Sequence, residues 1–230
     1  MSVKVTWLGH AAFLIETGKY NLVIDPFLTD NPQASCKADE LPELSAILVT
    51  HGHRDHLGDT LHLAKKFNCL VVSTVEIANY LKGRGVKHVH GQQPGGAWKH
   101  PFGKVKLTRA FHGSFLPDGS YGGQPVGFLL EVEGVTIYHA GDTALFSDMK
   151  LIGRKGVDLA LLPCGDNFTM GTEDAALAAT YIHPRIAVPM HYGTWELIDT
   201  DPQDFARRLQ GSSIKPVILK PGESLSQLIR

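Results

Sequence analysis

The stretch Thr50-His51-Gly52-His53-Arg54-Asp55-His56-Leu57-Gly58 places four metal-binding side chains within six positions. The apolar run at residues 46–49 precedes it and predicts a short buried strand. Residues 57–67 follow with apolar side chains at helical spacing, which predicts a helix. The four side chains therefore belong to a tight turn between a core strand and a helix.

The alternation of a strand turns His51 and His53 toward the same side. Asp55 and His56 come after the chain has begun to turn, so they point elsewhere. This arrangement favours two neighbouring metal ions over a single ion. Imidazole and carboxylate groups are zinc-type ligands, and an ion with an open coordination position activates water.

The pattern His51-x-His53-x-Asp55-His56 resembles the signature of the metallo-β-lactamase superfamily. Within it the chain is most similar to the UPF0173 group of metal-dependent hydrolases. Ascorbate-phosphate lactonases and N-acylphosphatidylethanolamine-hydrolysing phospholipases D are more distant look-alikes. Periodicity alone predicts a mixed α/β protein, and the resemblance implies an αββα four-layer sandwich.

Three more strands are each followed by a metal-binding side chain. His112 ends the alternating strand 103–112, Asp142 follows the strand 135–140, and His191 follows the strand 185–190. Because these strands all release such a residue at one end, we expect the ends to converge on a shared cleft. A carboxylate with two oxygens, such as that of Asp142, could bridge two cations.

The resemblance assigns these residues to two metal positions, one motif match at a time. It implies a first position with His51, His53 and His112, and a second with Asp55, His56 and His191. Asp142, in a Gly-Asp-Thr motif, would bridge the two ions. Zinc is the default for such ligands, and Mn²⁺ or Fe²⁺ would also be accepted.

His10 and Asp25 stand at the ends of two N-terminal strands, 3–8 and 21–25, which with 11–16 predict an antiparallel sheet. The resemblance implies that Asp25 bonds to a metal-binding histidine, and a ligating imidazole needs such a partner. His10 is interpreted either as a substrate contact or proton donor, or as a buried structural histidine. Asp55, Asp142 and His10 are the candidates for protonating the leaving group.

Four other histidines, His62, His88, His90 and His100, are predicted to lie on the surface, whereas His139 is predicted to be core or to support a ligand. The irregular segments 26–45, 113–125 and 164–171 are candidate rims of a substrate site. Phe115 and Tyr121 could offer apolar contacts there.

Composition narrows the class of protein. The 230 residues suit one domain, 1–230, and the net charge of −1 gives no support to nucleic acid as a partner. Three cysteines without a CxxC pair predict reduced thiols, hence a cytoplasmic protein. The sequence shows no signal peptide and no membrane span, and it leaves homo-oligomerisation open.

These features predict a hydrolase in which water activated by a metal pair cleaves an ester, lactone, amide or phosphodiester bond of a small molecule. An iron-dependent oxidoreductase on the same fold is the alternative. Diiron relatives in the superfamily carry Glu at the position of His53, so the histidine there favours hydrolysis, and an oxygenase with a single iron stays open. A nuclease is a weaker alternative, since the chain has no basic stripe.

Overall fold

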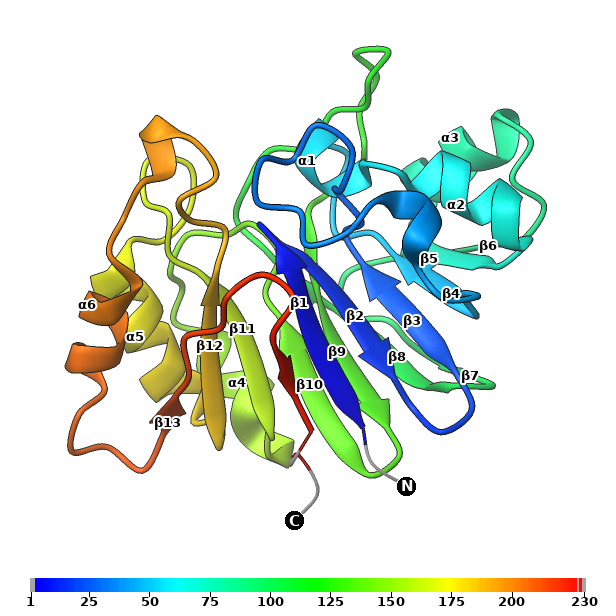
Figure 1. Cartoon of the computed structure of the whole chain (residues 1–230). Coiled ribbons are helices and arrows are strands. Elements are labelled where there is room, and N and C mark those ends of the chain that lie inside the picture. The colour runs from blue at the N-terminus through cyan, green and yellow to red at the C-terminus, as the bar shows by residue number, and fades with distance from the viewer. Residues whose placement is uncertain (1–2, 227, 229–230) are drawn as a thin grey trace.

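The computed structural model describes residues 3–226 and 228, which form two seven-stranded sheets packed face to face (Figure 1). The first sheet has the strand order β14-β1-β2-β3-β4-β5-β6. Its strands are β1 (Lys4–Gly9), β2 (Ala12–Glu16), β3 (Asn21–Ile24), β4 (Ala46–Leu48), β5 (Leu70–Thr74), β6 (Val89–Gln92) and β14 (Ser224–Leu225).

The second sheet has the order β13-β12-β11-β10-β9-β8-β7. Its strands are β7 (Ala97–His100), β8 (Gly103–Arg109), β9 (Val126–Val132), β10 (Val135–His139), β11 (Leu159–Pro163), β12 (Ile186–Met190) and β13 (Lys215–Pro216). The predicted strands before His112, Asp142 and His191 therefore exist as β8, β10 and β12, each slightly shorter than predicted.

Each sheet changes from antiparallel to parallel along its width. β1, β2 and β3 are antiparallel as predicted, and β3 to β6 are parallel. In the second sheet β7 to β10 are antiparallel and β10 to β13 are parallel. Helices lie in the crossovers of the parallel halves, because parallel neighbours cannot be joined by a tight turn.

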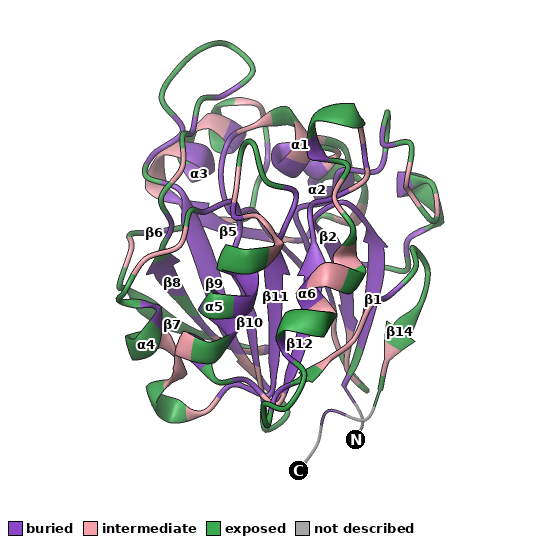
Figure 2. Cartoon of the chain, turned by 90° about the vertical axis from the view of Figure 1, so that its left-hand side faces the viewer, coloured by how far each residue is buried: buried purple, intermediate pink, exposed green. Residues whose placement is uncertain are grey.

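Helices cover the outer faces of both sheets, so the predicted αββα sandwich is confirmed (Figure 1). One core fills the space between the sheets and extends under the helices of the second sheet, and another lies between the first sheet and its helices. Buried residues follow the strands through the middle of the molecule (Figure 2).

The helices are α1 (Arg54–Leu57), α2 (Thr60–Phe67), α3 (Val75–Gly83), α4 (Met149–Ile152), α5 (Thr172–Ile182) and α6 (Pro202–Arg208), with 3₁₀ turns η1 (Ala38–Glu40), η2 (Gly153–Lys155) and η3 (Glu196–Ile198).

The helix predicted over 57–67 is interrupted, and the break shapes the site. α1 ends at Leu57, and Gly58 adopts a positive φ of 41°. A side chain there would overlap the carbonyl oxygen of Pro26, so the loop after β3 passes directly against the break. The next residue, Asp59, accepts hydrogen bonds from the Leu28 and Thr29 amides and is the N-cap residue before α2. Helical spacing alone does not reveal this close approach.

The surface prediction is wrong for one of the four histidines. His100 is buried and stacks on Phe102 with ring centroids 5.0 Å apart. His62 and His88 are exposed and His90 is partly exposed. Within the described residues no helix has the length and apolar character that a bilayer crossing requires.

Candidate metal centre

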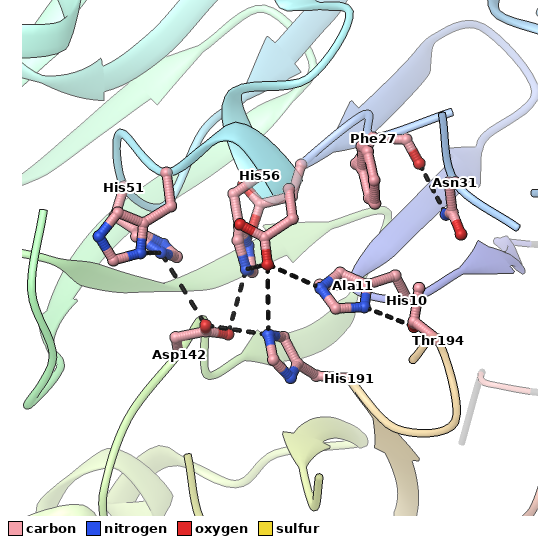
Figure 3. A network of polar contacts seen from close by, with 12 residues as sticks. His10, Ala11, Phe27, Asn31, His51, His56, Asp142, His191 and Thr194 are labelled. Atoms are coloured by element: carbon pink, nitrogen blue, oxygen red, sulfur yellow. Dashed lines mark hydrogen bonds and ion pairs between the residues drawn. The ribbon is translucent and has the colours of Figure 1, made fainter. Parts of the chain in front are cut away.

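The candidate metal-binding side chains come from strand ends of both sheets and meet at one edge of the sandwich (Figure 3). The turn after β4 supplies His51 and His53, and α1 supplies Asp55 and His56. The segments after β8, β10 and β12 supply His112, Asp142 and His191, and β1 leads into His10. Residues separated by more than 130 positions in the sequence are therefore neighbours.

One group consists of His51, His53 and His112. The Nε2 atom of His51 lies 3.0 Å from Nδ1 of His53, and the His112 ring lies 5.1 Å from that of His51, centroid to centroid. One nitrogen of each ring falls within 4.8 Å of the others. These are the three residues that the resemblance assigns to the first metal position.

A second group gathers around one oxygen of Asp55. Its Oδ2 atom lies 3.1 Å from Nε2 of His10, and 3.7 Å from Nε2 of both His56 and His191. Asp55, His56 and His191 are the residues predicted for the second metal position. His10 is an additional member, which the sequence analysis considered only as a substrate contact, proton donor or structural residue.

Asp142 lies between the two groups. Its Oδ1 is 3.2 Å from Nε2 of His56, and its Oδ2 is 3.0 Å from Nε2 of His191. The same Oδ2 is 3.5 Å from Nε2 of His112 and 3.9 Å from Nε2 of His51. One buried carboxylate thus reaches histidines of both groups.

Asp25 and Thr50 orient two of the imidazoles from behind. Asp25 accepts hydrogen bonds from the Thr50 amide at 2.8 Å and from the Thr50 hydroxyl at 2.6 Å. Its Oδ2 also lies 2.7 Å from Nδ1 of His56, so in the neutral ring, the form that binds a metal, this nitrogen carries the proton and Nε2 keeps its lone pair. The Thr50 hydroxyl, already donating to Asp25, accepts from Nδ1 of His51 at 3.0 Å in the same way. Asp25 therefore contacts a histidine of the centre, as the resemblance implies.

Burial and the carboxylates of Asp55 and Asp142 shift the pKa values of the histidines in opposite directions. Burial lowers the pKa of His51 well below its usual value. Burial also disfavours a charged His56, but the surrounding carboxylates, chiefly that of Asp142, raise its pKa well above the usual range. The same balance raises the pKa of His191 to about 9. Burial would raise the pKa of the Asp142 carboxyl, yet the neighbouring imidazoles hold it well below its usual range, so this group is an anion.

Left-handed backbone conformations hold three of these residues. His10, Asp25 and His191 have φ values of 55°, 45° and 57°. Such conformations are uncommon for residues with side chains and persist only where the surroundings impose them. The His191 amide donates to the carbonyl of His10 at 3.0 Å, which joins the ends of β12 and β1. The fold thus keeps these three residues in an unfavourable backbone conformation, and their side chains point toward the centre.

A cavity of about 750 Å³ opens over the centre. All three candidate rim segments contribute aromatic or polar residues to it, namely Phe27 and Asp30, Phe115, and Phe168. Trp195, which the sequence analysis missed, completes the apolar part of its wall.

Two other residues singled out in the sequence take no part in the centre. Tyr121 pairs with Phe115 in an isolated β-bridge, but it is 66% exposed and does not line the cavity in the described part of the chain. His139 is buried, and its Nε2 donates to the Ala11 carbonyl at 2.9 Å, so it belongs to the core.

Known proteins of the same architecture were found by both sequence and structure. A family model described as the beta-lactamase superfamily domain matches residues 20–192. A UPF0173 metal-dependent hydrolase of Lysinibacillus sphaericus (strain C3-41) is 51% identical over 230 residues, covering 97% of this chain and 99% of the relative. Igni18, a metallo hydrolase of the archaeon Ignicoccus hospitalis KIN4/I, is 33% identical with a TM-score of 0.90, and the alignment covers 98% of each chain.

CmlA, a diiron β-hydroxylase from Streptomyces venezuelae, has a TM-score of 0.78 at 15% identity and covers 98% of this chain and 54% of its own. At that identity the likeness shows the fold alone.

The match of the family model and the near-complete overlap with the Lysinibacillus relative establish the family. The chain belongs to the UPF0173 metal-dependent hydrolases of the metallo-β-lactamase superfamily.

Proposed function

We propose that the chain is a dinuclear metal-dependent hydrolase that uses water to cleave an ester, lactone, amide or phosphodiester bond of a small molecule. The observation that carries the proposal is the position of Asp142. Its two oxygens lie 3.0–3.9 Å from imidazole nitrogens of two separate groups. A carboxylate in that position can neutralise charge at two neighbouring cations.

The residues present fit divalent ions. Nε2 of His56, Nε2 of His191 and Oδ1 of Asp142 are buried without a hydrogen-bond partner. Buried polar atoms normally have a partner, so these atoms, which face one another, suit the coordination of a cation. Metal–nitrogen distances of about 2.0–2.1 Å at a tetrahedral ion give ligand–ligand distances of about 3.3 Å. The separations around Asp55 and Asp142, from 3.0 to 3.9 Å, bracket that value.

His51, His53 and His112 would hold one ion, and Asp55, His56 and His191 the other. Bound divalent ions would supply a water molecule whose pKa is lowered to about 7, together with positive charge beside the scissile bond. Zn²⁺ is the default for this donor set, and Mn²⁺ or Fe²⁺ use the same ligands.

The remaining task of the chain is to exclude bulk water and to return a proton to the leaving group. Of the three candidates, Asp55 has the most accessible side chain, 24% exposed against 3% for Asp142 and 0% for His10. Asp55 also lines the cavity. We therefore assign proton transfer to the Asp55 carboxylate, which would accept the proton that the attacking water loses and pass it to the leaving group.

The cavity wall favours an uncharged substrate with an apolar or aromatic group. Phe27, Phe115, Phe168 and Trp195 form its apolar part. Among the described lining residues Arg54 is the one Lys or Arg side chain, and its guanidinium is paired with Asp30. Apart from the proposed ions, the described part of the wall thus offers apolar contact and no unpaired Lys or Arg side chain for a phosphate group.

The test is a panel of substrates assayed with Zn²⁺, Mn²⁺ and Fe²⁺ added to protein purified without metal. The panel holds p-nitrophenyl esters of increasing acyl length, aryl lactones, anilides and bis(p-nitrophenyl) phosphate. Asp142→Ala should abolish turnover and reduce bound metal, whereas Asp39→Ala, an exposed carboxylate outside the centre, should change neither. An active, metal-replete Asp142→Ala variant contradicts the bridging role.

The oxidoreductase alternative predicts a different result in the same preparation. Protein purified without added metal would contain iron, show ligand-to-metal absorption bands and consume oxygen. Zinc content with hydrolysis and no oxygen uptake excludes it. The nuclease alternative predicts turnover of the phosphodiester or of DNA above that of the carboxylic esters.

A further inference from the structure

His10 has no access to substrate. Its side chain has no exposed surface. Phe27 and Trp195, which line the cavity, pack against the His10 ring with centroids at 5.7 and 5.0 Å. A group enclosed in this way cannot deliver a proton directly to a substrate in the cavity, so the role of His10 depends on the residues that its two ring nitrogens contact inside the protein.

A chain of hydrogen bonds fixes which nitrogen of His10 carries the proton. The Gln33 side-chain amide donates through Nε2 to the Tyr192 carbonyl at 3.1 Å, so its Oε1 faces Thr194. The Thr194 hydroxyl donates to that oxygen at 3.2 Å. Since a hydroxyl has one proton, its oxygen must accept from Nδ1–H of His10, which lies 2.7 Å away (Figure 3).

The other nitrogen of His10 is then left with a lone pair in the neutral ring. This Nε2 lies 3.1 Å from Oδ2 of Asp55, another atom with lone pairs. Two acceptors at this distance repel unless a cation or an extra proton lies between them. Nε2 of His56 and Nε2 of His191 point into the same space, and one ligand atom of each of the four residues falls within 4.8 Å of the others.

We propose that Nε2 of His10 is a fourth protein ligand of the second metal position, beside Asp55, His56 and His191, and that Thr194 and Gln33 are positioning residues that fix its tautomer. The inference rests on the proposed dinuclear function. It parallels the support that Asp25 gives to His56, since in both cases Nδ1 is held from behind and Nε2 faces the centre.

The extra ligand makes the two positions unequal. The second would have four protein ligands in addition to Asp142, and the first would have three histidines and Asp142. Ligands of both positions line the cavity, namely His53 and His112 of the first and Asp55 and His191 of the second. The first position, with one protein ligand fewer, would therefore be the one more open to water and substrate.

Metal titration of the purified, metal-free protein tests the proposal. Zn²⁺ is added in the presence of a chromophoric chelator of known affinity, and bound metal is counted by mass spectrometry. The wild-type protein should bind two ions. His10→Gln, which keeps a polar side chain of similar size, should weaken one of the two sites by about 10–100-fold and leave the other unchanged.

The positioning residues have matched variants. Thr194→Val keeps the shape but removes the hydroxyl, and should weaken the same site by about 10-fold. Thr194→Ser restores the hydroxyl and should restore the affinity. Thr200→Val serves as the control, because the Thr200 hydroxyl bonds to the Cys164 carbonyl away from His10, and should bind both ions like the wild type.

A measurement on labelled protein separates ligation from a structural role. In ¹⁵N-histidine NMR spectra, His10 should show a protonated Nδ1 in both states, and Nε2 should shift when metal is added. Two ions bound with wild-type affinity by His10→Gln, or an Nε2 signal unmoved by metal, would overturn the ligand role while leaving the dinuclear function intact. A wild-type protein that binds one ion or none would overturn both.

Discussion

Replacing Asp25 by Asn tests whether a buried carboxylate behind the centre is required. Asp25 has no exposed surface and accepts three hydrogen bonds, one on Oδ1 and two on Oδ2. Asn tolerates the left-handed backbone at this position, where φ is 45°, so the change acts through the side chain.

The amide cannot satisfy all three donors. If its oxygen takes the place of Oδ2, the Thr50 hydroxyl and His56 keep a neutral acceptor, but the amide nitrogen confronts the Thr50 N–H. A hydrogen bond to a charged group contributes about 1.5–3 kcal/mol, and an unsatisfied buried donor costs about 1–3 kcal/mol. Allowing for partial relaxation, Asp25→Asn should reduce the free energy of unfolding by about 2–4 kcal/mol.

Urea unfolding of the metal-free protein, followed by circular dichroism at pH 7.5, measures this loss as a lower midpoint at unchanged slope. Asp30→Asn is the matched control, because Asp30 also has a positive φ, of 63°, but is exposed and forms an exposed ion pair with Arg54. Asp30→Asn should lower the free energy of unfolding by less than about 0.5 kcal/mol. If Asp25→Asn proves as stable as Asp30→Asn, the hydrogen-bond reasoning is refuted.

Three further results are expected. Burial and then His90 lower the pKa of His100 to about 4, so its protonation below the unfolded value of about 6.5 favours unfolding. Wild-type stability should thus fall by about 1–3 kcal/mol between pH 6.5 and 4 relative to His100→Phe, measured by urea unfolding. Phe115→Ala and Phe168→Ala should raise KM for apolar esters about 5–20-fold with little change in kcat, and steady-state kinetics should show no such change for Tyr121→Ala. Zn²⁺ at 100 times Kd should stabilise the metal-free protein by about 2.7 kcal/mol per site, and calorimetry should show a Tm higher by several degrees.

The parts of the centre that follow strands could be predicted from the sequence. An apolar run followed within two positions by a histidine or aspartate marks His51, His112, Asp142 and His191, and both sheets direct such residues to one edge. Local patterns suffice there because the strand itself determines where its last residue points.

The role of His10 could not be predicted in the same way. Its partner Thr194 lies 184 positions away, and no local pattern connects them. The sequence shows a histidine after Gly9, which fits a ligand, a proton donor or a core residue equally well. Only the hydrogen-bond chain through Gln33 distinguishes these roles.

Two further features, a short edge strand and the burial of a residue at the border of a sheet, also could not be predicted from local sequence patterns. β14 contains two residues, too few for any periodicity. His100 occurs in a polar stretch, yet it lies where the borders of the two sheets meet and is covered by stacking on Phe102. Its burial depends on tertiary packing, which the alternation of side chains along β7 does not specify.

The hydrogen bond from the His191 amide to the His10 carbonyl joins the beginning of the chain to a point near its end. During synthesis, a nascent polypeptide shorter than 191 residues contains the His51-to-His56 turn and yet lacks a wall of the second metal position. In the proposed centre such a chain would hold an ion only loosely until β12 docks beside β11. Tight metal uptake would therefore require that the chain through His191 has been synthesised and has folded.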